Sequence, residues 1–248
     1  MAFAITDQIL LGRLFGTHTR RTNRTYLREV QWMNKLEIRD HIIPSGYKTK
    51  VFFIDGRPLY EYIHQWVAGS RELEIALSPI DDLAICWTDE YDHEGDTRFM
   101  RFVLKQSNAI IPILSCPEDF DFSCIVIVVE VAKQDDTVIW KRFGKVDHSG
   151  ESFEEEKRSG ILHTESYSEE DWSRYGDHFA SATTDSPEWM KWTDDHWAEE
   201  LYRRRVNYTF PYYQNEQNIE WLASSSFEFN RKEYDAIVNS CYKDQHIT

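Results

Sequence analysis

Residues 124–143 read CIVIVVEVAKQDDTVIWKRF, and this stretch decides the fold because it encodes two neighbouring strands. An apolar, β-branched run ends at Lys133-Gln134-Asp135-Asp136, and a second run, TVIWKRF, follows directly. β-branched and aromatic residues favour strands, and a short polar connection favours antiparallel pairing. We therefore expect an antiparallel hairpin at this point in the chain.

Further strands are predicted before this hairpin, at residues 83–87, 98–104 and 109–115. Upstream of them, KVFFI at residues 50–54 predicts a strand that ends in the turn Asp55-Gly56. Apolar residues then repeat at helical spacing from Leu59 to about Val67, and Gly69 is expected to end that helix. Together these segments predict an α+β fold built mainly on an antiparallel meander.

The second half of the chain predicts three helices. After a polar loop through residue 158, one helix is expected to begin near Ser168, and another at Ser186-Pro187-Glu188, which combines a cap, a first-turn proline and an early acid. The second helix carries one stripe: Trp189, Trp192, His196, Trp197 and Leu201. A last strand at 219–229 then meets Asn230 as the cap of a C-terminal helix with Tyr234, Ile237, Val238 and Cys241 at helical spacing.

No repeat, low-complexity tract or Gly/Pro/Ser linker divides the sequence, so we predict one α+β domain over residues 1–248. Within it we expect a basic N-terminal segment at 1–49, a core made of 50–147 and 219–248, and an acidic, Trp-rich helical insertion at 148–218. The longest apolar runs, 109–114 and 124–129, are far shorter than the roughly 20 residues that cross a bilayer. The N-terminal sequence lacks the basic opening of a secretory signal, so we expect a cytoplasmic protein that does not enter a membrane.

The distribution of charge points to a class of partner. Residues 151–200 contain fifteen Asp and Glu residues but only four Lys and Arg residues, which is −11 of the whole chain's −15. Tryptophans stand among these acids, at Trp172, Trp189, Trp192 and Trp197. Acids interleaved with large aromatics favour a negative face that binds a basic protein, whereas the overall negative charge repels nucleic acid.

Three patterns resemble chemical sites, but each lacks a required residue. The run 90–96 begins like a calcium loop, yet Arg101 stands where the bidentate acid is needed. Cys116 and Cys124 have no second pair of ligands for zinc and no evident base, and His196 with Glu200 lacks the second His of a zincin motif. We assign no catalytic residue, no metal ligand and no cofactor, and we expect the four cysteines to be thiols.

Four short motifs resemble a family of small, uncharacterised bacterial proteins. They are Ile54-Asp55-Gly56-Arg57-Pro58-Leu59, the segment between Ile113 and Val126 with its two cysteines, Val138-Ile139-Trp140-Lys141-Arg142-Phe143, and the closing segment from Phe227 to Ile237. This chain lacks the glycines, one cysteine and the Trp-Pro of that family's hairpin, and the family implies no activity. The resemblance also implies that the acidic stretch is an elaboration on a smaller scaffold, which is where partner recognition is expected.

The leading hypothesis is a non-catalytic immunity or antitoxin-type protein that neutralises a basic toxic effector, with a nuclease as one candidate, through its acidic, aromatic surface. The predicted partner-binding residues are Glu169, Asp171, Trp172, Glu188, Asp194, Asp195 and Glu199. Two alternatives stay open. One is a small hydrolase or metal-dependent enzyme that uses Cys116 or the acidic loop at 89–96, and the other is a structural subunit of an oligomeric assembly.

Overall fold

The computed structural model describes residues 33–46, 48–88, 91, 94–117, 122–159 and 205–242, and nine single positions of the acidic stretch: 169, 170, 173, 174, 187, 191, 192, 195 and 196. All of them belong to one compact unit, residues 33–248. Two antiparallel sheets and several helices form this unit, so the predicted α+β fold is confirmed. Among the described residues, no helix has the length and apolar character needed to cross a bilayer.

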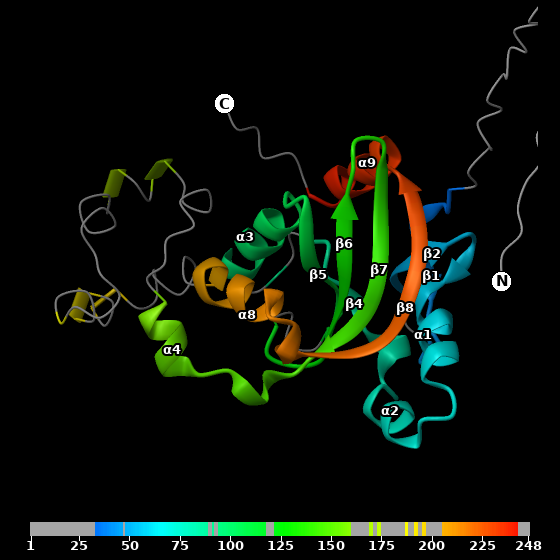
Figure 1. Cartoon of the computed structure of the whole chain (residues 1–248), viewed down its shortest axis with the longest axis horizontal. Helices are drawn as coiled ribbons and strands as arrows, with labels where there is room; N and C mark the ends of the chain where they lie inside the picture. Colours follow the sequence, from blue (N-terminus) through cyan, green and yellow to red (C-terminus); the bar gives the residue numbers. More distant parts are fainter. Residues whose placement is uncertain are drawn as a thin grey trace, which may run out of the picture. The chain divides into compact units, whose positions relative to one another are not determined.

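The larger sheet has five strands in the order β4-β5-β6-β7-β8 (Figure 1). They are β4 (Ala84–Ile85), β5 (Asn108–Ser115), β6 (Val126–Lys133), β7 (Thr137–Val146) and β8 (Ile219–Asn230). Each neighbouring pair is antiparallel, which confirms the predicted meander and the hairpin between β6 and β7. The register shifts twice between β7 and β8, and β8 curves along the sheet in Figure 1, as bulged strands do.

The smaller sheet has the order β1-β2-β3, with β1 (Leu36–Ile42), β2 (Lys48–Ile54) and β3 (Arg57–Pro58). The predicted turn joins β2 to β3, and it places Asp55 at φ 51° and Gly56 at φ 81°. The Asp55 carboxylate accepts hydrogen bonds from the backbone of Lys35 (2.8 Å) and the side chain of Asn34 (2.6 Å), which fixes the start of β1. We did not predict β1, because its alternation is only partly apolar and it lies in a basic segment.

The first and last helices of the described chain lie where the sequence predicts them, but a helix between them was predicted as a strand. α1 (Leu59–Val67) and α9 (Arg231–Cys241) lie where they were predicted, and the Asn230 side chain caps α9 by accepting from the Glu233 backbone at 3.1 Å. The strand predicted at 98–104 is wrong, because these residues belong to helix α3 (Glu94–Val103). Phe99, Met100 and Val103 are fully buried at helical spacing, and packing of this stripe overrides their strand propensity.

Shorter helices complete the described fold: α2 (Arg71–Ala76), η1 (Ile80–Asp82), η2 (His148–Gly150), α4 (Phe153–Arg158), the π-helix η4 (Arg205–Thr209), α8 (Phe210–Gln214) and η5 (Glu216–Asn218). Helix α4 occupies the segment that the sequence predicted as a polar loop. The Ser152 hydroxyl caps it by accepting from the Glu155 backbone at 3.3 Å. Three glutamates in its first turn also suit the positive end of the helix dipole.

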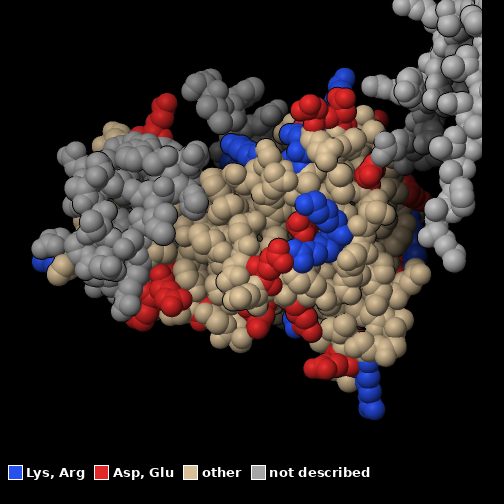
Figure 2. All heavy atoms as spheres, viewed as in Figure 1, with Lys and Arg blue, Asp and Glu red and all other residues tan. Residues whose placement is uncertain are grey.

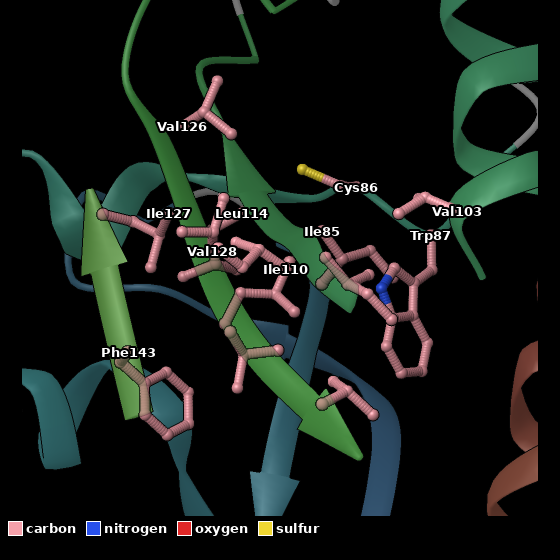
Figure 3. Close-up of a cluster of buried hydrophobic side chains, with 14 of the residues drawn as sticks. Ile85, Cys86, Trp87, Val103, Ile110, Leu114, Val126, Ile127, Val128 and Phe143 are labelled. Atoms are coloured by element: carbon pink, nitrogen blue, oxygen red, sulfur yellow. The ribbon is translucent and has the colours of Figure 1, made fainter. Parts of the chain in front are cut away.

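The core lies between the sheet and the elements on its two faces. The aromatic side chains of α1 pack on Phe143 of β7 and Phe227 of β8, whereas α3 and α8 contact β5 and α9 contacts β7 and β8 (Figure 1). Figure 3 shows how apolar side chains of the meander, among them Ile110, Leu114 and Val128, gather beside Trp87. Nearly every residue of β5 and β6 is buried, so these two strands form the centre of the fold.

The outer edge of β5 is closed by side chains. β4 pairs with only the last two residues of β5, Leu114 and Ser115. Further along, the Gln214 side chain accepts from the Ile110 backbone N–H (2.8 Å) and donates to the Ile110 carbonyl (3.0 Å), as a neighbouring strand would. Pro112 has no N–H, and its carbonyl accepts from the indole of Trp87 at 3.1 Å. An apolar strand edge that would otherwise template pairing with another chain is thereby satisfied.

Replacing Gln214 with Leu is expected to lower the free energy of unfolding by about 2 kcal/mol, because it leaves both backbone groups of Ile110 without their partner. Gln214→Glu keeps the acceptor and loses the donor, so it should lie between Gln214→Leu and the wild type. Urea unfolding measures both. The exposed Gln217→Leu is the matched control, and an equal loss in the control would contradict the role of Gln214.

Gly144→Ala is expected to destabilise the fold by about 1–3 kcal/mol through overpacking. A Cβ at position 144 would lie 2.4 Å from Cγ2 of Ile219 and 3.1 Å from the backbone oxygen of Glu220, so β7 and β8 would have to separate. Thermal unfolding against the exposed Ser224→Ala variant, expected to stay within about 0.5 kcal/mol of the wild type, tests this. A Gly144→Ala protein as stable as the wild type would show that the strands adjust without cost.

Candidate protein-binding surface

The predicted partner-binding residues fall on the part of the chain that the structure describes only at single positions. Glu169 and Asp195 are both helical and both exposed, as a binding role requires. Asp171, Trp172, Glu188, Asp194 and Glu199 lie outside the described residues. Helical positions at Glu169, Glu170, Ser173 and Arg174, and again at Pro187, Lys191, Trp192 and Asp195, agree with the two helices predicted there.

One tryptophan of the acidic stretch is buried. Trp192 is 8% exposed, and its ring stacks on His196 with the ring centroids 4.7 Å apart. Both the backbone N–H and Nδ1 of His196 approach the Trp192 carbonyl, at 3.1 and 2.9 Å. Trp192 therefore packs inward, and the aromatic part of the predicted surface cannot include it. Trp172, Trp189 and Trp197 lie outside the described residues.

Exposed carboxylates form what we call the acidic face. It consists of the described, exposed acids between residues 151 and 195: Glu151, Glu154, Glu155, Glu169, Glu170 and Asp195. Among its charged contacts, Arg174 pairs with Glu170 at 3.2 Å in an exposed i,i+4 geometry that contributes little stability. Such carboxylates keep their hydration and their long-range field, which is what steering of a basic partner needs.

The face of the large sheet has a different charge pattern. In Figure 2 one group of acidic side chains lies where α4 lies, and others lie over the sheet and at the upper and lower edges of the view, several of them next to basic side chains. Glu130 accepts from Lys141 at 3.0 Å, and Arg142 bridges Glu130 and Glu216. The guanidinium of Arg142 also stacks over the Trp221 ring at 3.7 Å. These charges compensate one another, so this face has no net field to attract a charged partner.

A buried ionic cluster lies between α4 and η4, the described elements before and after residues 160–204, and we call this place the base of the acidic stretch. Arg205, the first residue of η4, approaches Oδ1 of Asp96 on α3 at 3.2 Å and Oε1 of Glu156 on α4 at 3.5 Å. Burial tends to lower the pKa of the Arg205 guanidinium, but the facing carboxylates of Asp96 and Glu156 outweigh it and raise that pKa. Next to the cluster, burial raises the pKa of the Tyr213 hydroxyl well above its usual value.

The sequence does not predict this cluster. The run 90–96 begins like a calcium loop without its bidentate acid and is expected to be a solvated turn, whereas the structure places Asp96 on α3 with its side chain fully buried. Arg205 follows two other arginines and so has the appearance of a surface residue. Nothing in local periodicity pairs an aspartate of one helix with an arginine that follows far along the chain.

The four cysteines and the possible metal ligands bear on the enzyme alternative. All four cysteines are free thiols, and Cys116 and Cys124 are part-buried. Burial raises the pKa of the Cys86 thiol to about 12, although hydrogen bonds to Ser115 and Tyr91 partly oppose it. Within the described ranges, no group of three or more His, Cys, Asp or Glu side chains could hold a metal ion.

Comparison of the chain with protein-family models, curated proteins and solved structures finds no match. The resemblance to small bacterial proteins stays a prediction. The function must therefore be argued from the residues of this chain.

Cys86 is expected to resist alkylation in the native protein, because a thiol of pKa about 12 is ionised in only about one molecule in ten thousand at pH 8. Iodoacetamide labelling followed by peptide mass spectrometry, with and without guanidinium, measures this at each cysteine. Cys116 and Cys124 serve as internal comparisons, and native labelling of Cys86 at their rate would contradict its burial. Rapid labelling of Cys116 below pH 7 would instead favour the enzyme alternative.

Proposed function

We propose that this protein is a non-catalytic binding protein of the immunity or antitoxin type, which neutralises a basic toxic effector by covering it with the acidic face. The observation that carries the proposal is the concentration of charge: residues 151–200 hold −11 of the chain's −15, and six of the seven acids that the structure describes there are exposed, with Glu156 as the exception.

Physical chemistry explains why such a surface suits this role. Carboxylates repeat the negative charge of a phosphate backbone, so they compete for the basic surface with which a nuclease binds its substrate. A concentrated negative field also speeds association with a cationic partner, and salt weakens that effect. Slow dissociation would come from apolar and aromatic contacts at the centre of the interface, where the sequence predicts Trp172.

The described part of the molecule separates this face from the core. The exposed carboxylates lie on α4, just before it and after it, whereas Glu130, Lys141, Arg142 and Glu216 on the large sheet and beside it are paired with each other. Binding through the acidic face would therefore leave the sheet and its covered edge unchanged. A scaffold that keeps its shape on binding loses less conformational entropy to the complex.

The direct test is affinity as a function of salt. We expect the protein to bind the product of a neighbouring reading frame, and a deca-arginine peptide as a simpler probe, with an affinity that falls steeply as salt rises. A deca-glutamate peptide is the negative control. Binding that is absent, or that does not change with salt, contradicts the proposal.

Variants that lack some of the carboxylates test whether the acidic face is the surface that binds. The variant Glu154→Gln/Glu155→Gln/Glu169→Gln/Asp195→Asn is expected to weaken deca-arginine binding about tenfold, mainly through slower association. The matched control, Glu72→Gln/Asp82→Asn/Glu220→Gln/Glu233→Gln, removes four exposed carboxylates outside the acidic face and should change affinity less than about twofold. Equal effects of the two variants in a stopped-flow measurement would show that net charge matters and that this face does not.

A further inference from the structure

Arg205 joins three elements that are distant in the sequence. It begins η4, and its guanidinium contacts Asp96 of α3 and Glu156 of α4. The Asp96 side chain is fully buried, whereas those of Glu156 and Arg205 are 12% and 20% exposed. One cation therefore contacts two carboxylates that are largely removed from water.

The residues of this cluster come from two places that are far apart along the chain. Glu156 lies just before the stretch 160–204, and Arg205 comes just after it, so their ion pair brings the two ends of that stretch together. Two hydrogen bonds reinforce the closure, from the Ser152 backbone to the Tyr208 hydroxyl (2.8 Å) and from the Tyr212 hydroxyl to the Asp147 carbonyl (2.6 Å). Asp96 then fixes the closed base to the core.

The π-helical backbone of η4 points to the same constraint. π-helices are rare, and they occur mostly as single turns that are often found at functional sites. In η4 three of the five residues, Val206, Asn207 and Thr209, are buried. The residues that follow Arg205 therefore pack on the core while Arg205 contacts Asp96.

We propose that Arg205 is a positioning residue for the acidic face: it holds α4 and η4 against α3, and so fixes where the exposed carboxylates of α4 lie for a basic partner. This inference rests on the proposed function. Arg205 need not contact the partner. Loss of its guanidinium leaves the buried Asp96 carboxylate without this cation, which favours opening of α4 and η4 away from α3. An opened base lowers the populated fraction of the binding-competent arrangement, and the apparent affinity falls by that fraction.

The sign of the effect separates positioning from simple electrostatics. Arg205→Met makes the protein more negative by one charge, so charge alone would tighten binding to a cationic probe. Positioning predicts the opposite, a weakening of about tenfold. Arg174→Met is the matched control, because Arg174 is an exposed arginine of the same stretch, and that variant should bind deca-arginine as tightly as the wild type or more tightly. Arg205→Lys keeps the charge and should restore part of the affinity.

The experiment combines two measurements on the full chain. Hydrogen exchange measures whether α4 opens when Arg205 is lost. In Arg205→Met the amides of Glu156 and Ser159, which are hydrogen-bonded within and just after α4, should exchange about tenfold faster. The amides of β6 and β7 should keep their protection. Titration with deca-arginine measures the affinity of each variant for a basic partner. Glu156→Gln removes the more exposed of the two carboxylates that Arg205 contacts, and it replaces Arg205→Met in the exchange measurement if that variant does not fold.

Each outcome decides the proposal. Faster exchange confined to α4 together with weaker binding supports it. Unchanged exchange, or binding as tight as that of Arg174→Met, overturns the positioning role and leaves the proposed function standing. A wild-type protein that does not bind deca-arginine or the neighbouring product overturns the proposed function and with it the positioning role, while the exchange data still show whether Arg205 closes the base.

Discussion

The packing of Trp140 is the interaction on which the two-sheet architecture depends. This fully buried indole of β7 has ring neighbours from β2, β8 and α9, with centroid distances of 6.1 Å to Phe52, 5.2 Å to Phe229 and 6.4 Å to Tyr234. Its N–H donates to the Tyr234 hydroxyl at 3.4 Å, so the one polar atom of the ring is also satisfied. Edge-to-face contacts of this kind add specificity to the burial of a large apolar surface, and they fix how the small sheet and the C-terminal helix lie on the large sheet.

The parts of the fold that the sequence predicted correctly are those in which local preference and tertiary packing agree. The β-branched runs of β5 and β6 are buried on both faces, those of β7 are buried mainly on one, and Asn230 caps α9 through a bond within its own turn. The errors arise where these two influences differ. α3 carries aromatic and β-branched residues that favour a strand, but it buries Phe99 and Val103 on one helical stripe. β1 owes its place to the Asp55 turn, a contact that no pattern within β1 reveals.

The sequence predicts that the candidate surface consists of carboxylates and aromatic residues, but it does not predict which of them are exposed. Local composition identifies the excess of carboxylates, but exposure depends on which of them face the core. The motifs that carry the resemblance to small bacterial proteins supply mainly core residues, such as Ile54, Trp140, Phe143 and Tyr234. In this chain these residues contribute to the packing of the scaffold. The pairing of Asp96 with Arg205 depends on tertiary structure alone, so it could not be predicted.

Helix α4 shows how one kind of side chain takes two roles within a single turn. Glu154 and Glu155 are exposed and add to the field of the acidic face, whereas their neighbour Glu156 is mostly buried against Arg205. The excess of negative charge on the surface raises the free energy of the compact state through self-repulsion, and exposed pairs such as Glu170 with Arg174 offset little of it. A cation placed under the same helix acts on that cost directly, since it binds one carboxylate of α4 and one of the core. Arg205 therefore offsets part of that cost for the two carboxylates that it contacts, and salt screens these buried contacts less than it screens the exposed pairs.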